Sequence, residues 1–280
     1  MSAGATYMRR YNERLRARRI ALPLWAELLW QAVLISAAFL IYFGVRGATE
    51  ASERQALDNA AVLVDLQARA GLLWEVQLQA LIADSQVLVT LANWVYIWGH
   101  WPLIGVVTIW LFTRQRTAFY LLRNAIFISG AIGLVFFLAI PMAPPRLFPE
   151  LNVVDTVTTH STAYRALQPP ALVNQYAAFP SLHVGFNLLV GIVLFRHSRR
   201  VLVRSLAVAM PVAMGVAVVL TANHFVLDVV AGCVVALVGF VIAIRVRDLH
   251  LADPVRAAAS RRLRSPMWEG RIHGHTPRRS

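Results

Sequence analysis

Residues 221–244 read Thr-Ala-Asn-His-Phe-Val-Leu-Asp-Val-Val-Ala-Gly-Cys-Val-Val-Ala-Leu-Val-Gly-Phe-Val-Ile-Ala-Ile, a polar opening followed by an apolar run. The run has the length of a helix that crosses a bilayer, which takes roughly 20 apolar residues. His224 and Asp228 stand at its start, and ionisable groups at such positions are costly and often functional. The stretch predicts a membrane-spanning helix with a polar pair at one end.

A second segment, Ala177-Ala-Phe-Pro-Ser-Leu-His183, also places a histidine where an apolar run begins. Proline favours the first helical position, so a span is expected to start near Pro180. The free N–H groups of a helix start attract phosphate, and Ser181 adds a hydroxyl donor. The structural alternative is a capped helix start with an interfacial histidine.

The composition predicts an all-α integral membrane protein. Hydrophobic residues make up 58% of the 280 residues, charged residues 15%, and mean hydropathy is +0.57. Such values indicate that the bilayer is the solvent. We expect a bundle of six transmembrane helices, at about 24–45, 87–112, 125–141, 181–196, 203–222 and 226–245. Five spans are the alternative if 24–45, which carries Glu27 and Gln31, lies on the surface.

The arginines predict the orientation of these spans. All 27 basic residues are arginines. With six spans, one side receives the N-terminal cluster, the loops near residues 114–123 and 196–204, and the tail from Arg245 on, whereas the other side receives few. Positively charged loops are cytoplasmic as a rule, so both termini are expected in the cytoplasm of a cell that carries the protein in its plasma or inner membrane. His183 and His224 then lie at the outer face.

The same pattern divides the chain into three parts. We expect a basic cytoplasmic arm over 1–22, a membrane domain over 23–247 and a partly disordered basic tail over 248–280. Within the membrane domain, 51–83 is expected to form outer amphipathic helices broken near Gly71, and 142–180 an outer loop.

Charge and cysteine content exclude other classes. The net charge of +13 is spread over loops with the asymmetry of a membrane topology, so no nucleic-acid partner is expected. The single cysteine, Cys233, lies within a predicted span and leaves no possibility of an internal disulfide.

Histidine and carboxylate at this spacing suit nucleophilic catalysis. Four residues apart on a helix, Asp228 can accept the proton on one ring nitrogen of His224 and leave the other nitrogen free to attack. Arg146, which follows Pro144 and Pro145, offers a planar bidentate donor suited to phosphate. Alternatively, the pair is an ordinary polar helix end and Arg146 a contact for lipid headgroups.

Three motifs in order carry a resemblance to a known family. Pro-Pro-Arg at 144–146, Pro-Ser-Leu-His at 180–183 and His-x-x-x-Asp at 224–228 resemble the type 2 phosphatidic-acid phosphatase superfamily. The resemblance covers about residues 90–240. It is greatest to the branch that contains the fungal inositol phosphorylceramide synthases and many actinobacterial membrane proteins.

The resemblance implies a role for each residue. His224 is expected to take the phosphoryl group as phosphohistidine, Asp228 to orient it, and His183 to protonate the leaving alkoxide. Arg146, Ser181 and the backbone N–H near Leu182 are expected to hold phosphate oxygens. The substrate implied is a lipid phosphate or phospholipid, with no metal and no cofactor.

The chain departs from the family at three positions. Phosphatases of the superfamily carry a lysine where this chain has Ala139, and a Ser-Arg pair where it has Ala217 and Val218. Fewer cations suit a phosphodiester better than a dianionic monoester. This favours transfer of a head group over simple lipid-phosphate hydrolysis, which stays the alternative.

Two further questions are left open by the sequence. Asn93, Tyr96 and His100 share one face of the second predicted span, and His100 is expected about 20 Å deep by the helical rise, far from the catalytic rim. A structural polar network is favoured there over a lining for the lipid acceptor. A non-catalytic lipid transporter or scaffold is the alternative of another class.

Overall fold

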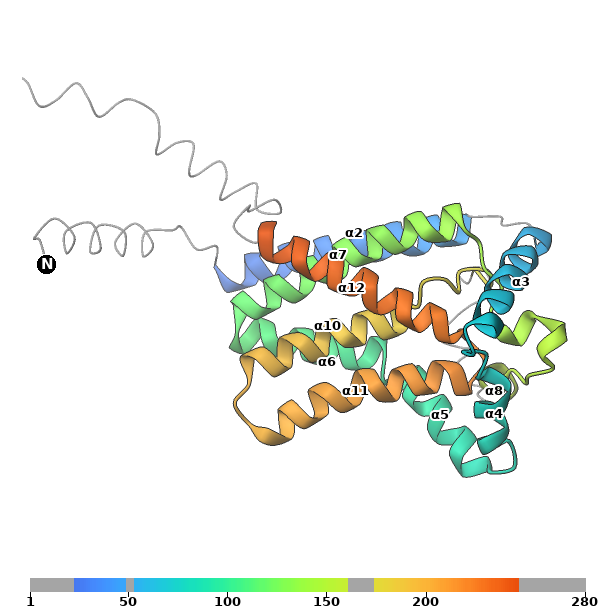
Figure 1. The fold of residues 1–280 in the computed structure, drawn as a ribbon. Helices are drawn as coiled ribbons and strands as arrows, with labels where there is room; N and C mark the ends of the chain where they lie inside the picture. The colour runs from blue at the N-terminus through green and yellow to red at the C-terminus, as the bar shows by residue number, and fades with distance from the viewer. Residues whose placement is uncertain (1–22, 49–52, 161–173, 247–280) are drawn as a thin grey trace, which may run out of the picture. The chain divides into compact units, whose positions relative to one another are not determined.

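The structure, a computed structural model, describes residues 23–48, 53–160 and 174–246 (Figure 1). These residues form helices and turns without a strand, apart from one isolated bridge between Met142 and Ala177. The all-helical fold class is thereby confirmed. The predicted basic arm and tail, 1–22 and 248–280, lie outside the described residues.

The described helices follow one another along the whole chain. They are α2 (Leu24–Ala48), α3 (Glu53–Arg69), α4 (Glu75–Ala83), α5 (Gln86–Trp98), α6 (Trp101–Arg114), α7 (Arg116–Ala139), the 3-10 turns η1 (Pro145–Leu147) and η2 (Pro149–Leu151), α8 (Thr156–His160), α10 (Leu182–His197), α11 (Val201–Leu220) and α12 (Val226–Val246). Among them, α2, α7, α11 and α12 are long and apolar enough to cross a membrane. A fifth span results if α5 and α6 count as one, and α10 is a shorter apolar helix.

Two predicted spans differ from the observed helices. The second is broken between α5 and α6, with a bend of 45°. Gly99 ends α5, and Pro102 in the first turn of α6 lacks the amide that would continue the helix. The third span begins at Arg116 rather than near residue 125, so Arg123 lies within α7. Its guanidinium packs over the Tyr120 ring and donates to the Asn124 amide oxygen, which stabilises the charge inside a helix.

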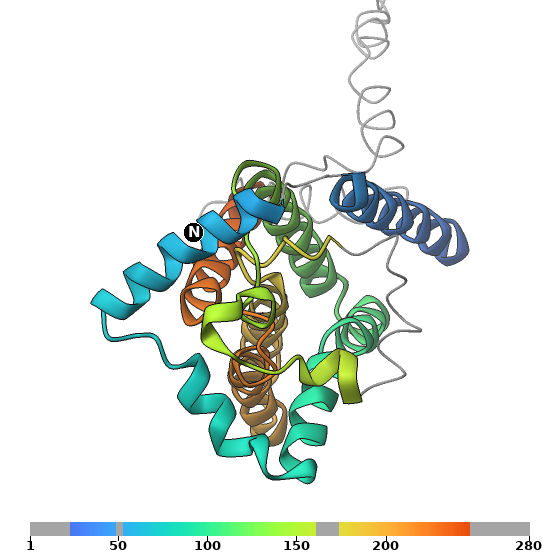
Figure 2. The ribbon, with the colours of Figure 1, turned by 90° about the vertical axis from the view of Figure 1, so that its right-hand side faces the viewer.

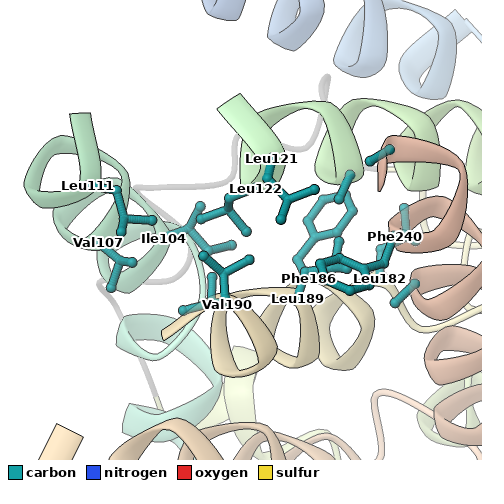
Figure 3. Packing of buried hydrophobic residues seen from close by; sticks show 14 of the residues in the cluster. Ile104, Val107, Leu111, Leu121, Leu122, Leu182, Phe186, Leu189, Val190 and Phe240 are labelled. Carbon is teal, nitrogen blue, oxygen red and sulfur yellow. The ribbon is translucent and has the colours of Figure 1, made fainter. Parts of the chain in front are cut away.

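Residues 35–247 form one compact unit, and the other unit is described only at 23–34. Within the larger unit, α10 lies in the middle and packs along α7, α11 and α12 (Figures 1 and 2). Figure 3 shows the core around it, in which side chains of α6, α7 and α12 surround Phe186, Leu189 and Val190. The apolar faces of these helices therefore meet at α10, which carries His183 in its first turn.

One glycine sets how closely α10 approaches α12. A Cβ atom at Gly232 would collide with the backbone carbonyl of Ser181. The Ser181 N–H donates to the carbonyl oxygen of Asp228 at 3.0 Å. The start of α10 is thus held against the first turn of α12, which brings the two sequence motifs together.

Helices α3 and α4 do more than cover the outer end of the bundle. They are separated at Gly71, whose φ of 67° favours glycine. Gln67 and Glu75 are fully buried, and their side chains accept the N–H groups of Leu227 and Val226, each at 2.8 Å. These N–H groups at the start of α12 have no intrahelical partner, so α3 and α4 supply its cap.

Candidate active site

The turn between α11 and α12 positions His224. The N–H groups of Asn223 and His224 both donate to the carbonyl of Val218, at 3.0 and 3.1 Å, and Ala222 takes a left-handed φ of 54°. His224 therefore lies in this turn, before α12 begins at Val226. The prediction that His224 and Asp228 share a helix is wrong for His224, because the chain must turn sharply here to pass from one helix to the next.

The predicted pairing of His224 with Asp228 is present nonetheless. The Nδ1 atom of His224 lies 3.4 Å from Oδ2 of Asp228. The same Oδ2 accepts the Phe225 N–H at 2.8 Å, and the carboxyl group is fully buried. With Nδ1 facing the carboxylate, Nε2 on the opposite edge of the ring is the nitrogen available for chemistry.

The start of α10 differs by two residues from the expectation. Helix α10 begins at Leu182, with Ser181 as N-cap and Pro180 before it, because the extended backbone of Ser181 is already bonded to Asp228. The Ser181 side chain is fully buried, and its hydroxyl has no hydrogen-bond partner among the described residues. Leu182 and His183 line the pocket described below, whereas Ser181 lies behind its wall.

His183 lies within a cluster of rings. Its imidazole centroid lies 5.7 Å from that of His224, 4.2 Å from that of His100 and 4.6 Å from the ring of Tyr96, on which it stacks. The expectation that His100 is far from the site is therefore wrong. The helical rise was counted along one continuous span, whereas the chain bends at Gly99 and turns His100 toward α10.

Asn93 has a different role from Tyr96 and His100. Its amide group donates to the carbonyl of Thr156 at 2.9 Å and accepts from the Thr156 hydroxyl at 3.0 Å. This buried pair fastens α5 to α8. The three residues that share a face in the sequence thus separate into a structural polar pair and two rings at the site.

Arg146 reaches the site from η1. Its backbone N–H donates to the Ala222 carbonyl at 3.0 Å, and Nη1 donates to the Asn223 amide oxygen at 2.6 Å. Nε lies 3.2 Å from the carboxylate of Asp155, which offsets part of its charge. Asn223 and Asp155 were missed by sequence reasoning. Asn223 had a signal in its place next to His224, whereas Asp155 looked like an ordinary loop carboxylate.

A small pocket of about 40 Å³ joins these groups. Its polar lining includes Arg146, His183, His224, Asn223 and His100, and Arg146 is the only arginine among the lining residues of the described chain. Such a cavity exceeds the volume of a single water site and suits a small polar group.

The three departures from the family pattern leave the site without further cations. Ala217 and Val218 are buried in α11, and Val218 packs in an apolar cluster with Tyr96 and Val184. Ala139 is the last residue of α7. In the described part of the chain, no group of three or more His, Cys, Asp or Glu side chains could hold a metal ion.

Fold and site together define a helical protein with apolar, span-length helices and a pocket built on two histidines, a buried aspartate and an arginine. The family model described as the PAP2 superfamily matches residues 61–242, and the chain belongs to this phosphatase superfamily. A solved structure of Aquifex aeolicus LpxE is similar over 60% of this chain and 93% of that one, at 16% identity and a TM-score of 0.47. The comparison with curated proteins gave no match.

Proposed function

We propose that the protein is a membrane enzyme that transfers a phosphoryl group, or a phosphorylated head group, from a lipid donor to an alcohol or water through phosphohistidine. The observation that carries the proposal is the meeting of His183, Arg146 and the His224–Asp228 pair at one pocket.

The arrangement suits a two-step reaction. Nε2 of His224 attacks phosphorus, the ester P–O bond breaks, and its electron pair leaves with the lipid oxygen, which takes a proton from His183. Asp228 stabilises the positive charge that the ring of His224 acquires. In the second step His183 removes the proton of the acceptor hydroxyl, whose oxygen displaces His224. Arg146 offsets the charge on the phosphate oxygens.

The charge of the site favours a phosphodiester donor and hence head-group transfer. One arginine lines the pocket, and Asp155 offsets part of its charge. A phosphodiester carries one negative charge and a monoester up to two, so the smaller cationic field suits the diester. The branch resembling inositol phosphorylceramide synthase is the corresponding relative in the superfamily. Simple lipid-phosphate hydrolysis is the competing function.

We further propose that residues 23–247 form one catalytic domain of six spans, with both termini cytoplasmic and the pocket at the outer face. Four long helices, the bent α5–α6 pair and α10 supply the count. A Cys233→Ser background with either Asp65→Cys on α3 or Ser198→Cys before α11 tests the orientation. An impermeant maleimide applied to intact cells should label position 65 and not position 198; the reverse result contradicts the orientation.

The reaction is tested with the purified protein in detergent containing EDTA. A panel of lipid phosphates and phosphodiesters is offered with and without alcohol acceptors, and released phosphate and new diesters are measured. Turnover is expected without metal, with loss in His224→Ala and retention in His197→Ala, a histidine at the other end of α10. Full turnover by His224→Ala would falsify the proposal. Lipid binding without turnover of any substrate indicates the transporter or scaffold instead.

A further inference from the structure

An apolar cavity of about 310 Å³ lies beside the catalytic pocket, between α2, α6 and α7 of the 35–247 unit. Tyr42 and Trp101 line both spaces, so the two share a wall. Most of the cavity lining is aliphatic or aromatic, with Arg123 and Thr108 as polar members.

We propose that this cavity binds one hydrocarbon chain of the lipid whose phosphate enters the catalytic pocket. The inference rests on the proposed function and adds the site that recognises the lipid chain. At about 30 Å³ for a methylene-sized group, by comparison with water, the cavity takes about ten such groups. That is one chain and not two.

The lining of α7 makes the cavity continuous with the catalytic pocket. Phe137 lines the catalytic pocket, and one helical turn earlier Leu134 lines the cavity. The cavity lining then continues through Gly130 and Ile126 to Arg123. From Leu134 to Arg123 the helix rises about 16 Å, the length of an extended chain of about the same ten groups. A lipid with its phosphate at His224 can therefore extend along this face of α7.

Arg123 ends the apolar part of the cavity. Its guanidinium lies over the Tyr120 ring, 5.0 Å from the centroid, and donates to the Asn124 oxygen at 2.7 Å. Hydrocarbon gains nothing by passing a charged group held in this way. The cavity consequently has one end at the catalytic pocket and a polar limit at the other.

Photolabelling of the full chain in lipid nanodiscs tests the inference without requiring turnover. The probe is a single-chain alkyl phosphate with a diazirine near its tenth carbon, and the control probe is the same hydrocarbon without phosphate. Labels should concentrate on residues 126–131 with the phosphate probe, and an unlabelled alkyl phosphate should compete them away. Equal labelling by both probes means that ordinary bilayer lipid fills the cavity, and the inference fails.

A matched pair of variants on α7 sharpens the test. Ala131 lines the cavity, whereas Val135, one turn later, is exposed and does not. Ala131→Trp should reduce labelling by the phosphate probe to the level of the control probe, and Val135→Trp should leave it unchanged. Equal effects of the two substitutions overturn the inference. His224→Ala should keep the label, so a failed proposal for catalysis remains distinguishable from a failed chain site.

Discussion

The imidazole of His100 lies against that of His183, with ring centroids 4.2 Å apart. His100 is buried at the bend between α5 and α6, and Tyr96 one turn earlier stacks on His183 as well. Two rings from a separate helix pair thus fix the plane of the histidine that we assign as proton donor.

His100 should act as a positioning residue for His183. His100→Ala should lower kcat by up to about a hundredfold, because a small misplacement of a reacting group can cost that much. The KM of the donor should change little. His100→Phe, which keeps a ring of similar breadth, should recover much of the loss. Equal losses in both variants, matched by equal falls in Tm, would indicate a merely structural residue.

Ser181 gives a test of phosphate contact. Its buried hydroxyl has no partner within the described residues, so Ser181→Ala should leave Tm unchanged or higher, because no hydrogen bond is lost. If phosphate is the missing partner, kcat/KM should fall about tenfold, the value of one hydrogen bond to a charged group. Unchanged kcat/KM in Ser181→Ala removes Ser181 from the substrate site.

Arg146 and Asp155 together test the charge argument. Arg146→Lys should lower kcat/KM for every substrate by about a hundredfold, as loss of a fixed donor to the transition state does. Asp155→Asn should instead raise the ratio of monoester to diester turnover, because the charge of Arg146 is no longer offset. Steady-state rates on matched monoester and diester lipids measure the ratio. An unchanged ratio contradicts the proposed basis for preferring a diester.

Glu75 should stabilise the start of α12. Its Oε1 accepts from both the Gln67 side chain and the Val226 N–H. Glu75→Ala leaves buried donors unpaired, at about 1–3 kcal/mol, and should lower Tm by several degrees together with kcat. Asp65→Ala is the control on α3, since its ion pair with Arg69 is exposed and contributes little. Similar effects of the two substitutions would contradict a specific cap.

Gly232 should be required for the approach of α10 to α12. Gly232→Ala places a methyl group against the Ser181 carbonyl and should abolish turnover by displacing the start of α10. Gly215→Ala is the matched control, because its Cβ would meet only Val229 at an ordinary 3.7 Å. Thermal unfolding and turnover of both proteins are compared; full activity of Gly232→Ala contradicts the assigned contact.

Local patterns in the sequence predicted much of the fold and little of what joins its parts. Apolar runs located α2, α11 and α12 closely, because burial in a bilayer depends on composition and length. Motif order placed His183, His224 and Arg146 together, as the structure has them. The bend at Gly99 depends on packing against α10, so the place of His100 could not be read from helical spacing.

The contacts of Asp155 and Gln67 were equally hidden from the sequence. Asp155 pairs with an arginine in another turn, and Gln67 binds the backbone N–H of Leu227. Such contacts join segments far apart in the chain and carry no periodic signal. The same holds for the apolar cavity, which exists only where α2, α6 and α7 meet.

The cap of α12 has a consequence for the order in which the protein is made. Glu75 and Gln67 precede the amides they accept by 151 and 160 residues. Synthesis runs from the N-terminus, so these acceptors are translated long before the last helix leaves the ribosome. The nucleophile becomes anchored only when that helix docks, and the enzyme stays inert until its final transmembrane segment has been delivered.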